Sequence, residues 1–542
     1  MKKNLRHILT ILIVVFCGLT GWGIVRDLGK SLWVREPHSR PIPQLHSSPA
    51  VIPVPQMHST RRDEFRDGAN VQIFTSSEPD EVILRFPSEE TYSEFLFALE
   101  GSKIRLIDHL DRLWAIRLGY DKWTDLANLL AGENMTTYES IPSIPAPNQV
   151  SVSPQEGLVE FGDGLLPWLG IDTDNSRWGA GVKIAVLDTG IVEHPALPGL
   201  VQSIEITPFP LDLSKINGHG TAVASLIASN DPVAPGVAPA SKLVSIRVGN
   251  DSGKADSFAL AAGILAAVDC GSQIVNCSMG TSENNPLIED AVLYARDHNV
   301  LIVAASGNSE QPEASYPAAY PSVISVGAVD ARGEHLDFSN YGTYLSLTAP
   351  GYAINAAWPG NRYARISGTS ASAPIVSGAI AATMSNGSGV TMSASQAAEI
   401  VMNESNEAGI PGPDSEYGVG ILNMHRVMNR GTPGIVDAAI TNQRLVKSGG
   451  SGSSDEIQVT VQNRGTTILI NTLVEINSPF GERKFNANMI APGAIQTFSM
   501  PVRLSNLKKN EPITVRSSLI LGTLGADITP ENNRRSDTLY KR

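Results

Sequence analysis

Cysteine is scarce in this chain, because its 542 residues contain three cysteines. A disulfide framework is therefore excluded as the source of its stability. Cys270 and Cys277 lie seven residues apart, near the end of an expected helix and within an expected strand. One disulfide between them is an alternative, but two buried free thiols are the preferred interpretation. The cysteines alone do not define the compartment.

Basic residues are also fewer than acidic residues in this chain. Lysine and arginine number 41 against 54 aspartates and glutamates, a formal net charge of −13. No basic patch offsets this charge, so nucleic acid is excluded as an expected partner. Hydrophobic content of 42% and charged content of 18% are ordinary for a globular protein. A chain of this length suggests three or four domains of roughly 150 residues each.

An uncharged apolar run occupies residues 8–25, "ILTILIVVFCGLTGWGIV", after Lys2, Lys3 and Arg6. Such a run with a basic flank is typical of an export signal or of a single membrane anchor, and residues 1–30 are assigned to one of these. In both cases the positive end stays in the cytoplasm. We therefore expect the rest of the chain to be extracytoplasmic, either anchored or secreted.

Changes in composition divide the remainder into four segments. Residues 31–79 are proline-rich and predict an extended linker. Residues 80–147 predict a compact α+β unit of order β-α-β-β-α-β, because Val82, Leu84 and Phe86 alternate and a helical stripe follows over residues 92–99. Residues 160–430 alternate apolar strands with alanine-rich helices, which indicates a parallel sheet covered on both faces. Residues 435–542 contain short alternating strands that predict a β-sandwich.

Three motifs in the 160–430 segment place polar residues at strand or helix ends. "VLDTG" ends an apolar strand at Asp188, where metal or ribose binding are rival interpretations. "NGHGTAVAS" puts His219 between two glycines at the start of an apolar helix, where a polar helix cap is the alternative. "AASGNS" ends a buried strand at Asn308, whose amide could donate a hydrogen bond or simply form a turn.

The fourth motif, "ISGTSASAP" at residues 366–374, raises the question of which hydroxyl does chemistry. A serine hydroxyl is a weak nucleophile without a neighbouring base, and a Ser/Thr-rich helix start is the alternative. Ser370 follows Gly368-Thr369 and begins a helix, so its backbone N–H can face an anion. We expect Ser372 to point elsewhere and Ser377 to lie inside the helix.

Taken together, these motifs resemble the subtilase family. Asp188, His219, Asn308 and Ser370 occur in the order of that family, and "GVAPASKL", "VNCSMG", "YPSVISVGAVD", "LTAPG" and "YGVGILN" also look like its segments. The resemblance covers about residues 165–430. It implies a subtilisin-like α/β fold and a serine endopeptidase that hydrolyses peptide bonds through an acyl-enzyme.

The resemblance also implies roles. Ser370 corresponds to the nucleophile, His219 to the base and Asp188 to the residue that orients it, while Asn308 and the Ser370 N–H hold the oxyanion. Two strands would wall the substrate pocket, and Gly253 would lie on the edge to which a peptide adds. The expected wall residues are Ser278, Met279, Gly280, Ala304, Ala305, Ser306 and Gly307.

The sequence departs from the family at positions other than Asp188, His219, Asn308 and Ser370. Ala222, Ala371 and Ile375 stand where histidine, methionine and histidine are common. Ser315 replaces a frequent glycine at the pocket floor, which favours small or medium apolar substrate side chains. No cofactor is required for the chemistry. Structural calcium is an open expectation, with Asn230 and Asp231 as suggestive positions only.

The flanking segments fit this interpretation. The 80–147 unit resembles the inhibitory propeptides of subtilases, and residues 435–542 resemble Ig-like (CARDB-type) surface modules. The expected protein is a self-processing, monomeric zymogen that acts on protein or peptide substrates. Two alternatives remain: a catalytically inactive subtilase scaffold, and an adhesin whose sandwich binds partners.

Overall fold

The computed structural model describes residues 70–76, 80–131, 133–138, 158–206, 217–312, 315–385, 389–446, 455–503, 511–522 and 525–540. The chain divides into two units, Met1–Val54 and Pro55–Arg542, and every described residue belongs to the second. The apolar run 8–25 and most of the expected linker therefore lie outside the described residues. Among the residues described, no helix has the length and apolar character needed to cross a membrane.

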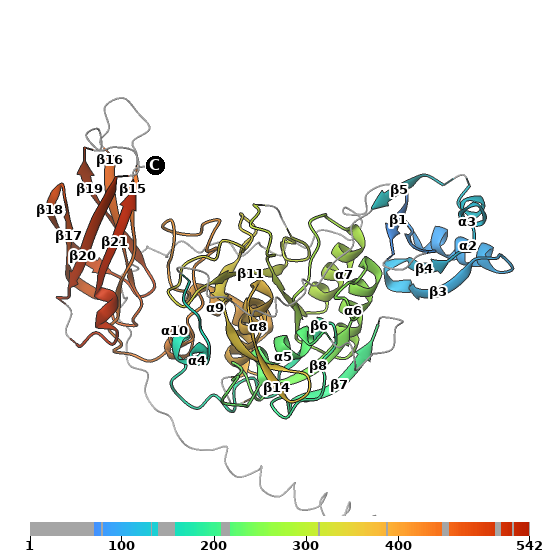
Figure 1. The fold of residues 1–542 in the computed structure, drawn as a ribbon, viewed down its shortest axis with the longest axis horizontal. Coiled ribbons are helices and arrows are strands. Elements are labelled where there is room, and N and C mark those ends of the chain that lie inside the picture. The colour runs from blue at the N-terminus through green and yellow to red at the C-terminus, as the bar shows by residue number, and fades with distance from the viewer. Residues whose placement is uncertain are drawn as a thin grey trace, which may run out of the picture. The chain divides into compact units, whose positions relative to one another are not determined.

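Residues 71–138 form one sheet and two helices, shown in blue in Figure 1. The predicted strand–helix–strand–strand–helix–strand order runs from β2 to β5. An additional strand, β1, was not predicted; it lies between β2, antiparallel, and β5, parallel. The elements are β1 Val71–Thr75, β2 Glu81–Arg85, α2 Glu89–Leu99, β3 Arg105–Leu110, the short 3-10 helix η2 Asp111–Leu113, β4 Ala115–Gly119, α3 Trp123–Leu129 and β5 Met135–Tyr138.

The sheet of this unit has two buried faces. Val82 and Leu84 of β2 point to one face with Ile116 and Leu118 of β4, and they pack against α2 and α3. This is the face that the alternation in the sequence predicted. The other face carries Ile83, which belongs to a different buried cluster.

A seven-stranded parallel sheet forms the centre of the next part of the chain, with strand order β12-β11-β10-β9-β6-β8-β7. This confirms the predicted subtilisin-like α/β architecture. Its strands are β6 Lys183–Asp188, β7 Leu200–Glu205, β8 Lys242–Arg247, β9 Ile274–Cys277, β10 Leu301–Ala305, β11 Val323–Val329 and β12 Leu347–Pro350. A hairpin of β13 Ile354–Trp358 and β14 Arg362–Ile366 stands apart from this sheet.

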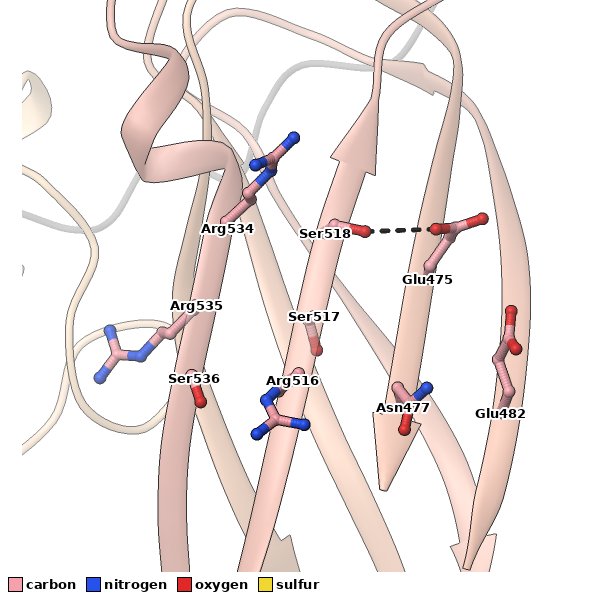
Figure 2. A pocket seen from close by; sticks show the side chains of 9 residues that line it. All are labelled: Glu475, Asn477, Glu482, Arg516, Ser517, Ser518, Arg534, Arg535 and Ser536. Atoms are coloured by element: carbon pink, nitrogen blue, oxygen red, sulfur yellow. Dashed lines mark hydrogen bonds between the residues drawn. The ribbon is translucent and has the colours of Figure 1, made fainter. Parts of the chain in front are cut away.

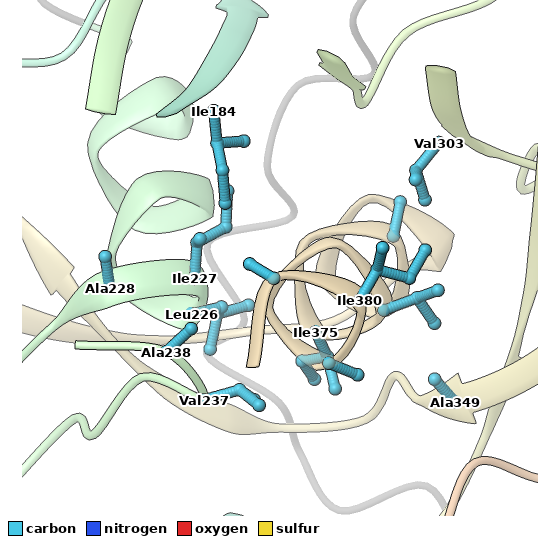
Figure 3. Packing of buried hydrophobic residues seen from close by; sticks show 14 of the residues in the cluster. Ile184, Leu226, Ile227, Ala228, Val237, Ala238, Val303, Ala349, Ile375 and Ile380 are labelled. Carbon is cyan, nitrogen blue, oxygen red and sulfur yellow. The ribbon is translucent and has the colours of Figure 1, made fainter. Parts of the chain in front are cut away.

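Helices cover both faces of the parallel sheet. Ile184 and Val186 of β6 share a core with α5 and α8, whereas Ala185 and Leu187 share another with α6 and α7. Figure 3 shows Ile375 and Ile380 of α8 in the first of these cores. Because successive side chains of a strand point to opposite faces, a strand buried on both sides is continuously apolar. The helices are α4 Leu165–Trp168, α5 His219–Ala228, α6 Ser257–Asp269, α7 Pro286–Asp297, α8 Thr369–Ser385, α9 Ala394–Asn403 and α10 Met424–Asn429.

The C-terminal part is a β-sandwich, as predicted, with one core between a three-stranded and a four-stranded sheet. The sheets have the orders β15-β16-β19 and β18-β17-β20-β21. The strands are β15 Ala438–Val446, β16 Asp455–Asn463, β17 Leu469–Ser478, β18 Gly481–Ile490, β19 Ile495–Val502, β20 Pro512–Ile520 and β21 Arg534–Tyr540, with a short 3-10 helix η4 at Pro530–Asn533.

Cys270 and Cys277 are both free thiols, which confirms the preferred interpretation over a disulfide. Cys277 ends β9 in the buried sheet, and Cys270 caps the C-terminus of α6.

Candidate active site

Asp188 is the last residue of the central strand β6 and is fully buried. Thr189 donates its backbone N–H to Asp188 Oδ1 at 2.7 Å. Both carboxylate oxygens lie 2.8 Å from Nδ1 of His219. A buried carboxylate needs such donors, because burial without them disfavours its charged form.

His219 is the first residue of α5, and glycines on each side allow it to lie there. Gly218 has φ +76°, and a Cβ at that position would lie 2.6 Å from the Trp358 ring. A Cβ on Gly220 would lie 2.4 Å from the Gly190 carbonyl oxygen. Any larger residue would displace the helix start. The close approach of the chain to Trp358 and to the end of β6 thus places the imidazole beside Asp188.

The Asp188–His219 contact determines how the imidazole can act. A carboxylate only accepts hydrogen bonds, so the Nδ1–H of His219 is the donor in this pair. In the neutral ring Nε2 then carries the lone pair and can accept a proton.

Ser370 is the second residue of α8 and is 5% exposed. Its hydroxyl donates to the Ser278 carbonyl at 3.2 Å, so its single proton is not directed at His219 in this structure. In return Ser278 donates its hydroxyl to the Ser370 carbonyl at 3.2 Å. Pro374 explains this second bond: proline has no N–H, so the carbonyl four residues earlier in the helix lacks its usual donor. A proline inside α8 therefore ties the start of that helix to the segment after β9.

Asn308 follows β10, and its amide has a fixed orientation. Its Oδ1 accepts both the backbone N–H and the hydroxyl of Thr369, each at 2.9 Å. The Thr369 oxygen in turn accepts the N–H of Gly307 at 3.2 Å. With Oδ1 occupied, Nδ2 is the end of the amide left to donate, and it lies 3.1 Å from where a Cβ on Gly368 would be.

The two predicted pocket walls follow adjacent parallel strands. Residues 278–280 come directly after β9, and residues 304–307 run from the end of β10. Ser315 lies against both: a Cβ on Gly280 would be 2.5 Å from its Oγ, and a Cβ on Gly307 would be 3.4 Å from its Cβ. The structure thus brings Ser315 between the two segments. Gly253 has φ +76° in the turn between β8 and α6 and donates to the Asn250 carbonyl at 2.9 Å.

Of the remaining sequence expectations, Ser372 donates to the Ala349 and Pro350 carbonyls, and Ser377 to Asn276 Oδ1, so neither hydroxyl is free. The side chain of Asp231, one of the two suggestive calcium positions, accepts the Tyr363 hydroxyl at 2.6 Å. Sequence reasoning gave no role to Thr369, although it lies in the quoted motif. No sequence signal distinguished its hydroxyl from those of its serine neighbours.

A shallow cavity of about 480 Å³ lies elsewhere, on the outer face of the four-stranded sandwich sheet. Figure 2 shows that its polar side chains come from β17, β18, β20 and β21, with a Ser518–Glu475 hydrogen bond across it. It contains serines, arginines and carboxylates but no imidazole, so it does not repeat the Asp188–His219 arrangement.

Comparison with known proteins identifies the family of this chain. Residues 179–420 match the subtilase family (Peptidase S8). The chain is 40% identical over 205 residues to subtilisin Savinase of Lederbergia lenta, covering 38% of this chain and 76% of that protein. It is also 40% identical to an alkaline protease of Shouchella clausii, of which it spans 54%. Among solved structures, a mutant of the protease domain of PatA is similar with 30% identity and a TM-score of 0.43, covering 47% of this chain and 97% of that one.

The chain belongs to the subtilase family. It is accordingly a serine endopeptidase with a subtilisin-like fold, and its relatives are proteases that need no cofactor for catalysis.

Proposed function

We propose that this protein hydrolyses peptide bonds with Ser370 as nucleophile, His219 as general base and Asp188 as the group that orients the base. The observation that carries this proposal is the pairing of His219 Nδ1 with both oxygens of the buried Asp188 at 2.8 Å. That pairing leaves Nε2 as a proton acceptor at the carboxyl end of the parallel sheet, where α8 begins.

The reaction follows from these groups. Rotation of the Ser370 hydroxyl away from the Ser278 carbonyl lets it give its proton to His219 Nε2 while Oγ attacks the substrate carbonyl carbon. The carbonyl oxygen gains negative charge, which the Nδ2 donor of Asn308 and the Ser370 N–H stabilise. The imidazolium then protonates the leaving amine as the C–N bond breaks. In the second half of the reaction His219 takes a proton from a water molecule that attacks the acyl ester. It returns that proton to Ser370 Oγ as the ester bond breaks and the acid product leaves.

The proposed substrates are polypeptides. The segments 278–280 and 304–307 would accept the substrate side chain, with Ser315 between them narrowing the space. Gly253 and its turn would offer an edge to an extended peptide. Small or medium apolar side chains are the expected preference.

We further propose that residues 1–30 direct export and that the 80–147 unit, with β1, is an inhibitory propeptide removed by the enzyme itself. Support comes from the docking of that unit on α6 and α7, where Phe74, Ile83 and Phe258 share one core. Calcium and oligomeric state stay as expectations from the sequence.

One experiment tests both the chemistry and the processing. Ser370→Ala is expected to accumulate as the full chain, whereas the wild type loses its N-terminal unit and is labelled by a fluorophosphonate probe. A Ser372→Ala variant is the matched control and should behave as the wild type. Equal trimming of the Ser370→Ala chain in a protease-free system would rule out self-processing, and absence of probe labelling in the wild type would rule out the nucleophile.

A further inference from the structure

The second face of the 71–138 sheet carries arginines among apolar residues. Ile83 pairs in register with Arg117, and Arg85 pairs with Ala115, so these side chains lie on one face. Ile83 and Ala115 are 0% exposed, Arg85 is 5% exposed and Arg117 is 3% exposed. The unit's own helices cover the opposite face. Something other than the unit itself therefore covers this one.

The cover consists of α6 and α7. Ile83 and Ala115 belong to the same buried cluster as Phe258 of α6 and Ile288 of α7. Apolar contact alone would suit many sheets with an apolar face, because the hydrophobic effect is non-directional. The arginines make the contact more specific.

Both Arg85 and Arg117 form buried ion pairs with the helices. Arg117 pairs with Asp256, the N-cap of α6, and also lies 3.4 Å from the Glu81 carboxylate of its own unit; the Arg117, Asp256 and Glu81 side chains are 4%, 0% and 17% exposed. Arg117 also lies over the Phe258 ring, 5.3 Å from its centroid. Arg85 pairs with Asp290 of α7, with side chains 6% and 17% exposed, and also donates to Gln72 at 2.5 Å.

A third arginine–aspartate pair joins the N-terminal unit to α6, but its side chains are exposed to solvent. Arg112 of η2 lies 2.7 Å from Asp269 at the end of α6, and these side chains are 47% and 53% exposed. Removing one partner of a buried pair leaves a charge without compensation, whereas an exposed pair contributes little. The chain therefore contains its own control for the effect of burial.

We propose that Arg117–Asp256 and Arg85–Asp290 make the α6–α7 face selective for this chain's own N-terminal unit and keep the unit bound after the connector is cut. The proposal rests on the proposed function, in which the connector is cut. A foreign unit with an apolar residue in place of Arg117 would bury the Asp256 carboxylate without the arginine that faces it here, so the pair disfavours other units as well as holding this one.

The test uses the full chain with Ser370→Ala and a recognition site for an added protease within residues 139–157. Clipping gives a two-piece complex, and the dissociation rate of the N-terminal piece is followed by size-exclusion chromatography. Asp256→Asn keeps an N-cap acceptor for α6. It is expected to speed dissociation by about 10–10²-fold, because buried Arg117 loses the carboxylate that α6 offers it while Glu81 of its own unit still compensates part of its charge. Asp269→Asn, the control at the exposed pair, is expected to change the rate by at most about fivefold.

Two further variants keep the proposal falsifiable if Asp256→Asn folds poorly. Asp290→Asn tests the second buried pair independently. The double variant Arg117→Gln with Asp256→Asn should dissociate more slowly than Asp256→Asn alone, because the interface then buries no arginine that lacks its α6 carboxylate. Glu81, the other carboxylate near Arg117, belongs to the N-terminal unit and stays with it in the bound and the free state. Equal small effects at buried and exposed pairs, faster dissociation of the double variant, or a wild-type complex that separates as soon as it is clipped would each overturn the proposal. The Ser370→Ala chain is inactive by design, so a failure of the proposed catalysis leaves this readout unchanged.

Discussion

At the scale of single residues, Thr369 fixes the orientation of the Asn308 amide, the proposed oxyanion donor. Its N–H and hydroxyl both hold Oδ1 of Asn308 at 2.9 Å. An amide that could flip would present oxygen instead of nitrogen to the developing oxyanion and would repel it. Holding the amide in one orientation before substrate arrives avoids that cost of reorganisation.

Asn308→Ala is predicted to lower kcat by about 10²–10³-fold with little change in KM, a magnitude taken from the loss of the comparable donor in subtilisin. The donor acts on charge that appears in the transition state, so substrate binding should be spared. Steady-state kinetics on a peptide amide substrate measures both constants. A raised KM with an unchanged kcat would instead make Asn308 a turn or binding residue.

The four residues proposed for catalysis could be selected from the sequence because glycine and helix or strand ends mark each of them. Asp188 ends an apolar strand, and His219 lies between glycines that the structure shows in close contact with Trp358 and Gly190. The Ser278–Ser370 exchange of hydrogen bonds could not be predicted. It joins residues 92 positions apart, and only the folded backbone shows which carbonyl Pro374 leaves without a donor.

At the scale of elements, alternation predicted the strands that have one clear apolar face. It missed β1, a five-residue strand that lies within residues 31–79, which were expected to be an extended linker. In the sandwich it missed β15. It also missed β18 and β21, whose sequences "GERKFNANMI" and "RRSDTLY" are rich in charged and polar residues. In such strands, pairing with a neighbour rather than burial of an apolar side chain decides the structure, and a single sequence carries little record of pairing.

The segment after α9 meets the sandwich through buried polar groups. Gln462 of β16 accepts the Glu407 N–H at 3.0 Å and donates to the Ser405 carbonyl at 3.4 Å. Gly412 donates its N–H to the Glu407 carboxylate at 3.0 Å. Burial raises the pKa of Glu407 to about 7, and nearby Asp414 adds to the rise.

Glu407→Gln is predicted to flatten the pH dependence of stability between about pH 4.5 and 7. The folded state holds this proton more tightly than the unfolded state, so the wild type loses stability as pH rises through that window. The Glu407 contribution is at most about 3 kcal/mol. Thermal unfolding should give similar Tm values for the two proteins at pH 5 and a higher Tm for Glu407→Gln at pH 8. Parallel Tm curves for the two proteins would contradict the assignment. Asp437, whose pKa burial also raises, adds a contribution of the same sign in both proteins.

At the scale of the whole molecule, the sandwich makes direct contacts with the protease domain. Besides the Gln462 bonds, Asn442 of β15 donates to the Gly409 carbonyl. Within the sandwich, Arg464 donates to Gln462 Oε1 at 3.2 Å and so supports the residue that makes these bonds. Burial lowers the pKa of Arg464 to about 10, although Asp437 favours its charge. These contacts distinguish a docked module from one carried on a free tether.

Deleting residues 435–542 is predicted to destabilise the protease domain. Three hydrogen bonds to residues 405–409 are lost, and at about 0.5–1.5 kcal/mol each the loss is about 2–4 kcal/mol. For a domain of this size the Tm should fall by about 4–16 °C. Calorimetry of the truncated and full chains, both as Ser370→Ala to prevent autolysis, measures this shift. An unchanged Tm would favour an independent adhesion module, and casein cleavage by the truncated active chain would show whether catalysis needs the sandwich.

The two described cysteines differ in a way that suits chemical labelling. Burial raises the pKa of the Cys277 thiol to about 12, so this thiol is protected from alkylation. Cys270 is partly exposed at the end of α6, next to Asp269, which pairs with Arg112 of the N-terminal unit. In a chain lacking residues 1–69, a thiol-reactive dye would therefore attach at Cys270. Without an added cysteine, the protein thus has an attachment position for a fluorescent dye at the border between the enzyme and the N-terminal unit.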